Sequence, residues 1–177
     1  MKRPVITVFA DSGATPFDGV YAYAGDAIGK KAGHIICPLR EGLWPKALVN
    51  AALKHAKTQI TFVTTPETVL VDIPAGIDIE TAQDHRAANM RAASLGQTIV
   101  GLPANFGTIS ALYTAWADLG GAQSGKTVGL LNRKNAFEVV RGFFTDVAAV
   151  GIGNIDHLIQ ISDNFDDLLN RLMRLEN

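Results

Sequence analysis

Short apolar runs alternate with longer segments of helical period along almost the whole chain. The short runs are rich in Val, Ile, Leu and Thr and are too short for helices, so they indicate buried strands. The predicted strands are 5–10, 34–37, 59–64, 98–102, 127–131 and 157–161. A further run, 69–73, would add an edge strand.

Between these runs, apolar residues recur with the 3.6-residue period of amphipathic helices. The predicted helices are 20–31, 45–55, 81–95, 107–119, 137–147 and 165–175. Gly33 and Gly120 stand where a helix often ends on a left-handed residue, and Asp163 is placed to cap the last helix. The alternation predicts an α/β fold: one Rossmann-like, three-layer domain over 1–177, with a mostly parallel sheet of six to seven strands flanked by helices.

Composition narrows the class of partner. The chain has 177 residues, 47% of them hydrophobic, which suffices for one buried core. The formal net charge is −1 and the longest basic clusters are pairs such as Lys30-Lys31, so neither nucleic acid nor an anionic membrane surface is indicated as a partner. The first apolar run is broken at Asp11, too early for a secretory segment or a membrane span, so we expect a cytoplasmic protein.

The residue types that usually bind metals or form disulfides are sparse. Cys37 is the one cysteine, so no disulfide forms within the chain, and its apolar run predicts a buried, unreactive thiol. The histidines, at 34, 55, 85 and 157, are scattered without metal-ligand spacing. We therefore expect neither a metal site nor a cofactor.

Two loops that leave predicted strands carry residues suited to phosphate. Ligands of open parallel sheets lie beyond the carboxyl ends of the strands. Ser12 and Gly13 follow the first strand and offer a hydroxyl and a small backbone, although an ordinary turn would look the same. Residues 103–108 open directly into a helix, whose free N–H groups favour an anion. The candidates there are Asn105, Phe106, Gly107 and Thr108, with simple helix capping by Thr108 as the alternative.

These segments carry a family resemblance. Residues 103–111 resemble a divergent form of the P-G-G-x-G-T-x-x-E signature of the LOG family, the cytokinin riboside 5′-monophosphate phosphoribohydrolases. Ala104 and Asn105 replace the two glycines of that signature. Further similar segments, in the same order as in the family, are 8–12, 60–66, 126–132 and 163–172.

The resemblance implies a homodimer that hydrolyses the base–ribose bond of a nucleoside 5′-monophosphate without a metal. Residues 84–90 are similar to the helix that bears the family's functional arginine, which places Arg86 in the catalytic role, with Arg91 as a competitor and a solvated helix face as the alternative. The family's catalytic glutamate falls on Ala111. Asp118, seven positions further along, is about 10 Å away along a helix and cannot replace it unaided.

The loop after the second predicted strand also departs from the family. It reads Arg40-Glu41-Gly42 where the family is glycine-rich, and only Gly42 and the following leucine persist. Arg40 is suited to pair with a phosphate, and Glu41 or Glu67 could supply the missing carboxylate, with Glu41 the choice for a catalytic role. The alternative is a solvated ion pair on a loop.

The sequence therefore predicts a LOG-like protein that binds a phosphorylated small molecule, a nucleoside 5′-monophosphate, and hydrolyses it if Arg86 and Glu41 act together. The loss of the glutamate at Ala111 favours an alternative: a non-catalytic carrier or sensor that resembles the related molybdenum-cofactor carrier proteins, which bind a phosphorylated pterin. A structural homodimer with a vestigial pocket is a third interpretation. The residues leave these open.

Overall fold

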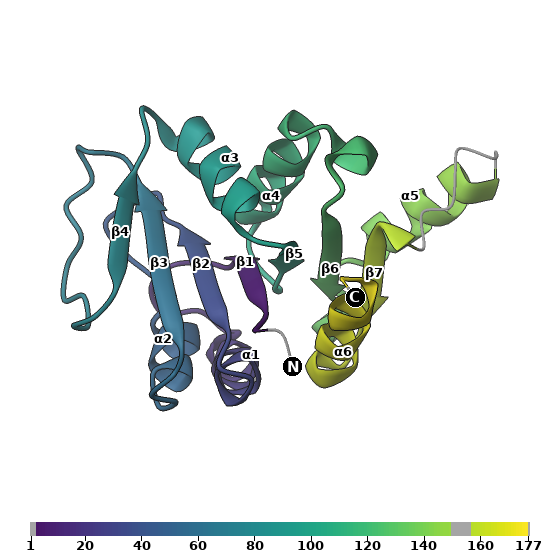
Figure 1. The fold of residues 1–177 in the computed structure, drawn as a ribbon. Coiled ribbons are helices and arrows are strands. Elements are labelled where there is room, and N and C mark those ends of the chain that lie inside the picture. Colours follow the sequence, from purple (N-terminus) through teal and green to yellow (C-terminus); the bar gives the residue numbers. More distant parts are fainter. Residues whose placement is uncertain (1–2, 150–156, 177) are drawn as a thin grey trace.

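One parallel sheet organises the protein in a computed structural model that describes residues 3–149 and 157–176 (Figure 1). Its order is β4-β3-β2-β1-β5-β6-β7, and every pair of neighbours is parallel. The strands are β1 (Val5–Phe9), β2 (His34–Pro38), β3 (Gln59–Thr64), β4 (Asp78–Thr81), β5 (Thr98–Gly101), β6 (Thr127–Leu131) and β7 (Ile159–Ser162). This confirms the predicted α/β, Rossmann-like architecture.

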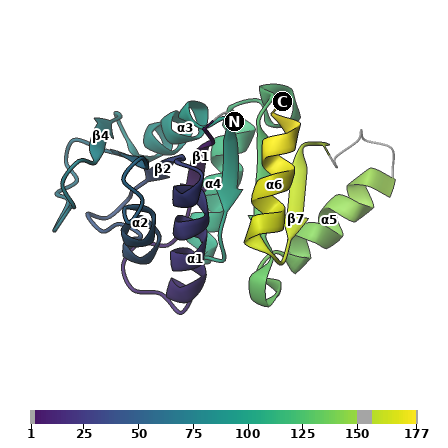
Figure 2. The same ribbon diagram turned by 60° about the horizontal axis from the view of Figure 1, so that its bottom comes forward.

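Helices cover both faces of the sheet. Figure 1 shows α1, α2 and α6 on one face and α3 and α4 on the other, and Figure 2 shows that α5 extends outward beside β7. The helices are α1 (Asp18–Lys30), α2 (Lys46–Ala52), α3 (His85–Leu95), α4 (Phe106–Asp118), α5 (Glu138–Ala149) and α6 (Phe165–Leu175), with two short 3₁₀ turns, η1 (Gly121–Ser124) and η2 (Arg133–Asn135).

The sheet is buried on both faces, which explains why its strands appear as unbroken apolar runs. Tyr21, Leu48 and Phe62 pack in the core under α1 and α2, and Phe9 and Leu112 pack in the core under α4. Cys37 lies in the first of these cores, as predicted, and burial raises the pKa of its thiol to about 12.

The sheet has its topological switch point between β1 and β5. From β1 the chain proceeds through β2, β3 and β4 toward one edge, then returns to β5 on the other side of β1. Thr7 of β1 therefore pairs with Ile36 on one side and Ile99 on the other. Because the loops after β1 and β5 diverge there, a crevice is expected at the carboxyl ends of these strands.

The predicted edge strand at 69–73 is wrong. The place beside β3 belongs to β4, where Asp78 pairs with Thr61. Residues 69–73 instead fold against the loop after β2, because Val71 N–H donates to Gly42 O at 3.2 Å and Trp44 Nε1 donates to Val71 O at 3.0 Å. The predicted helix start at residue 81 is also wrong, since β4 extends to Thr81 and α3 begins only at His85.

Predicted element ends differ from the structure at several places, three of which follow. Asn164, not Asp163, caps α6, because its side chain accepts from Asp167 N–H at 3.0 Å. Ala32 is the left-handed residue after α1, with φ of 53°, whereas Gly33 is needed for space: an added Cβ would lie 2.5 Å from Ile28 Cγ2. Gly120 is left-handed after α4, with φ of 101°, as predicted. The last strand is Ile159–Ser162 rather than 157–161.

Candidate functional site

The switch point holds a pocket of about 340 Å³, which we call the switch-point pocket. Its wall is built from the loops after β1, β2 and β5 and from the first turns of α3 and α4. Six of the predicted site residues line it: Ser12, Arg40, Glu41, Asn105, Gly107 and Thr108. Residues as far apart in the sequence as Ser12 and Thr108 thus meet at the switch point, where ligands of parallel sheets bind.

A carboxylate of the chain already occupies part of the predicted phosphate cradle. Thr108 Oγ1 donates to Asp11 Oδ1 at 2.6 Å, and Asn105 N–H donates to Asp11 Oδ2 at 2.9 Å. Asn105 Oδ1 accepts from Thr108 N–H at 3.0 Å, so Asn105, rather than Thr108, caps α4. Gly107 N–H lies in the first turn of α4, where it has no acceptor within the helix and contributes to the positive end of the helix dipole.

Tyr21 joins the loop after β1 to the loop after β5. Its buried hydroxyl accepts from Asp11 N–H at 2.9 Å and donates to Pro103 O at 2.7 Å. Burial raises the pKa of this phenol, so it stays protonated and keeps its donor. The two loops that carry Ser12 and Thr108 are therefore fixed relative to each other.

The loop after β2 is also anchored. Gly13 N–H donates to Trp44 O at 3.1 Å, which joins this loop to the one after β1. Gly42 has φ of +56°, and an added Cβ would lie 2.4 Å from Val69 O, so the glycine is required by both conformation and space. Arg40 and Glu41 extend from this anchored loop as exposed side chains on the pocket wall. Gly13 and Gly42 therefore support the pocket rather than line it.

Helix α3 presents a different face to the pocket than expected. His85 and Asn89, one turn apart, line it. Arg86 points elsewhere: its Nε and Nη2 donate to the two carboxylate oxygens of Asp118 on α4, each at 2.8 Å. This bidentate pair lowers the pKa of Asp118, chiefly through the hydrogen bond from Arg86. Arg86 is mostly exposed and does not line the pocket, and neither does the exposed Phe106.

His85 and Asn89 were missed at the sequence level. Both lie within residues 84–90, the segment that contains Arg86, and residues four apart share a helix face, but the local sequence does not determine which face meets the pocket. The Nδ1 atom of His85 is buried and has no hydrogen-bond partner in the described part of the chain. A ligand with a polar edge would find there both a ring nitrogen and an amide.

The pocket has two side chains on its wall that could act as an acid or base, His85 and Glu41. Ala111 lines it at the position that matches the family glutamate. Among the described lining residues, Glu41 is the one acidic side chain. No group of three or more His, Cys, Asp or Glu in the described ranges is arranged to hold a metal ion. None of the helices in these ranges is both long and apolar enough to cross a bilayer.

Comparison with known proteins identifies the fold. No family model matches the chain, and no curated protein matches it. Among solved structures, the molybdenum cofactor binding protein of the phototrophic bacterium Rippkaea orientalis superposes with a TM-score of 0.68 at 13% identity, covering 100% of this chain and 99% of the other.

Two further solved structures have the same fold. The molybdenum cofactor carrier protein of Chlamydomonas reinhardtii gives a TM-score of 0.64 at 14% identity, with 98% of each chain covered. A structural genomics target gives 0.62 at 15% identity, covering 97% of this chain and 99% of that one. These neighbours are consistent with the predicted resemblance to a divergent LOG-like and molybdenum-cofactor-carrier-like Rossmann fold.

Proposed function

We propose that this protein is a non-catalytic carrier that binds a phosphorylated pterin-type molecule in the switch-point pocket. The observation that carries the proposal is Ala111, which leaves a methyl group on the pocket wall where a phosphoribohydrolase of the LOG family needs its glutamate. The pairing of Arg86, a predicted catalytic residue, with Asp118 outside the pocket supports the same conclusion. The carrier proteins among the structural neighbours support the same function.

The pocket offers suitable partners for both parts of such a ligand. Arg40 supplies a guanidinium for the phosphate, and Ser12 and Gly107 N–H supply neutral donors nearby. Leu43 gives the wall an apolar side chain for a flat ring. A volume of about 340 Å³ lies within the range of small-molecule sites, which is about 300–1,000 Å³.

The same residues argue against turnover. Cleavage of a base–ribose bond builds positive charge on the sugar, and a fixed carboxylate must stabilise it or orient the attacking water. Asp11 is engaged by Asn105 and Thr108, and Glu41 stands on an exposed loop. We therefore expect binding of nucleoside 5′-monophosphates to be weaker than binding of the pterin, and their hydrolysis to be absent.

The proposal includes a cytoplasmic location and a homodimer. Light scattering coupled to size-exclusion chromatography, with and without ligand, would determine the oligomeric state. A mass of 18.9 kDa for the chain sets the monomer value, and a homodimer would give twice that mass.

Equilibrium binding of the molybdenum cofactor under anaerobic conditions tests the function. We expect saturable binding that Arg40→Gln weakens at least about tenfold, because a charge-assisted hydrogen bond is lost. Arg174→Gln, which removes the same charge from an exposed position on α6, should leave affinity unchanged. Equal loss in both variants, or no binding by the wild type, would contradict the proposal.

A further inference from the structure

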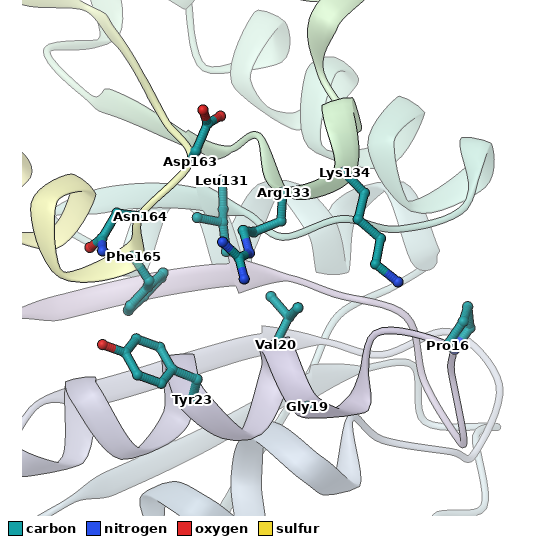
Figure 3. Close-up of a pocket in the computed structure, with 10 residues that line it drawn as sticks. All are labelled: Pro16, Gly19, Val20, Tyr23, Leu131, Arg133, Lys134, Asp163, Asn164 and Phe165. Carbon is teal, nitrogen blue, oxygen red and sulfur yellow. The ribbon is translucent and has the colours of Figure 1, made fainter.

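A second cavity, of about 430 Å³, also opens at the carboxyl ends of the strands (Figure 3). It lies between α1 and α6, beyond the ends of β6 and β7, and shares none of its lining residues with the switch-point pocket. We call it the α1–α6 cavity. Its walls are apolar at Val20, Leu131 and Phe165, and cationic at Arg133 and Lys134.

The two cations are directed into this cavity. Figure 3 shows the Arg133 guanidinium between Phe165 and Val20, and the Lys134 ammonium extending over the start of α1. No ion pair within the described ranges involves either side chain. The contact recorded for Lys134 Nζ is with the ring of Phe17, 5.9 Å from its centroid. The cavity therefore carries positive charge that the protein does not neutralise.

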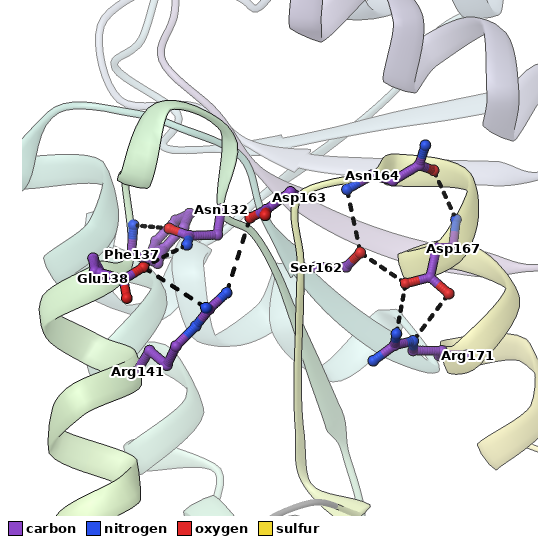
Figure 4. Close-up of polar contacts among 9 residues, drawn as sticks. All are labelled: Asn132, Phe137, Glu138, Arg141, Ser162, Asp163, Asn164, Asp167 and Arg171. Atoms are coloured by element: carbon purple, nitrogen blue, oxygen red, sulfur yellow. Dashed lines mark hydrogen bonds and ion pairs between the residues drawn. The ribbon is translucent and has the colours of Figure 1, made fainter.

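Asp163, the one carboxylate among the described residues that line the cavity, does not cancel this charge. Figure 3 shows Asp163 pointing away from Val20 and Tyr23, toward the outside of the cavity. In Figure 4 its carboxylate faces Arg141, with 3.9 Å between Oδ1 and Nη2. Asp163 and Arg141 thus interact with each other, and Arg133 and Lys134 are left for another anion.

An unfavourable backbone conformation fixes the turn that carries the two cations. Lys134 has φ of 54° and ψ of 33°, and Asn135 has φ of 58°, so two successive residues that bear side chains are left-handed. Buried Asn132 imposes this turn: its Oδ1 accepts from Phe137 N–H at 2.7 Å, and its Nδ2 donates to Glu138 Oε2 at 2.8 Å (Figure 4). Strained backbone of this kind is concentrated at functional sites.

The opposite wall is equally fixed. Ser162 Oγ accepts from Asn164 N–H at 3.2 Å and donates to Asp167 Oδ2 at 2.8 Å (Figure 4). Asp167 is held in turn by Arg171, with Nη2 and Oδ2 2.8 Å apart. Because both loops are anchored without a ligand, little conformational entropy would be lost on binding.

We propose that the α1–α6 cavity is a second binding site, for an organic anion with one carboxylate or phosphate monoester and a flat apolar group. The anionic group lies between Arg133 and Lys134, and the apolar group lies against Val20, Leu131 and Phe165. The site is independent of the proposed carrier function, because it uses other residues and other loops.

Titration of ¹⁵N-labelled protein with phenyl phosphate, benzoate and inorganic phosphate tests this site. We expect backbone shifts at Gly19, Val20 and Leu131, and tighter binding of phenyl phosphate or benzoate than of inorganic phosphate, because only they fill the apolar wall. The tighter of the two organic probes identifies the head group. Absence of shifts at these residues, or preference for inorganic phosphate, would overturn the proposal.

Variants that remove positive charge distinguish specific binding in the α1–α6 cavity from nonspecific attraction of anions to surface cations. The double variant Arg133→Gln, Lys134→Asn should weaken binding at least about tenfold. Asn tolerates the left-handed conformation of Lys134 better than lysine does, so the fold should be no less stable. The matched control, Lys54→Gln with Lys57→Gln, removes two exposed cations near the end of α2 and should leave affinity unchanged. An equal loss in the control would show nonspecific attraction and overturn the site.

Discussion

Thr108 donates its hydroxyl hydrogen to Asp11 across 2.6 Å, so the loop after β1 supplies the anion at the start of α4. In the LOG-like interpretation this position was a cradle for phosphate. The second carboxylate oxygen of Asp11 accepts from Asn105 N–H, and within the described residues the N–H groups of Phe106 and Gly107 are left as donors of the first turn. The start of α4 therefore still offers donors for an anion, but two of the donors there are bonded to the protein's own Asp11.

Removal of Asp11 should convert this terminus into a better anion site. In Asp11→Ala the hydroxyl of Thr108 and the N–H of Asn105 lose their acceptor, and a negative charge beside the pocket is removed. We expect inorganic phosphate to bind at least about tenfold more tightly, with backbone shifts at Gly107 and Thr108 in a titration. Asp78→Ala, on the exposed edge strand β4, removes an equal charge and should bind phosphate as the wild type does.

A carboxylate returned to position 111 should oppose binding. Ala111→Glu places negative charge on the wall of the switch-point pocket, where it repels a phosphorylated ligand. Ala111→Gln fills nearly the same space without the charge. We expect calorimetry with the molybdenum cofactor to show a larger loss of affinity for the glutamate variant than for the glutamine variant. Equal losses would show that only the volume at this position matters.

Tyr21 should stabilise the protein through its hydroxyl. Tyr21→Phe leaves the Asp11 N–H and the buried Pro103 O without their partner while retaining the ring in the core. We expect unfolding by urea to show a loss of about 1–3 kcal/mol, the usual range for unsatisfied buried groups. A loss below this range would mean that the hydroxyl bridge does not stabilise the fold.

The Arg86–Asp118 pair should be visible in a pH titration. Arg86 lowers the pKa of the Asp118 carboxyl below its ordinary value of about 3.8. In Arg86→Ala the pKa of Asp118 should rise toward that value, which carboxyl-detected NMR would measure. The stabilisation from the pair is present above the ordinary pKa and is lost as pH falls through the lowered pKa. Wild type and variant should therefore converge in stability at acidic pH, and divergence there would contradict this assignment.

Cys37 should be unreactive in the folded protein. It is buried, and burial raises the pKa of its thiol to about 12, so the thiolate that reacts with electrophiles is scarce at neutral pH. Ellman's reagent should label it only in denaturant. Rapid labelling under native conditions would show that the core around β2 opens readily.

The fold was largely accessible from the sequence because six of the seven strands are buried and apolar. β4 escaped detection because its four residues include a single large apolar side chain, Ile79, which is 48% exposed at the sheet edge. Nothing in the local pattern of Asp78–Thr81 distinguishes it from a loop. The apolar run at 69–73 was misassigned because the backbone of Val71 bonds to the loop after β2 rather than to a neighbouring strand.

The candidate site was predictable in position but not in detail. The loops after β1, β2 and β5 carry the pocket, as parallel topology requires. The bond between Asp11 and Thr108 joins residues 97 positions apart and follows from tertiary structure alone. The rotation of α3 decided that His85 and Asn89 face the pocket and that Arg86 meets Asp118, and no local motif reports that rotation.

Recovery of the bound ligand tests the central claim most directly. The protein would be incubated separately with the molybdenum cofactor and with nucleoside 5′-monophosphates, freed of excess ligand by gel filtration, and denatured so that its contents can be identified by chromatography. The account expects the pterin to be recovered intact, in a fixed ratio to protein, with no free base or ribose 5-phosphate in either incubation. Release of base and ribose 5-phosphate from a nucleotide, lost in Arg86→Ala or Glu41→Gln, would contradict it and establish a phosphoribohydrolase.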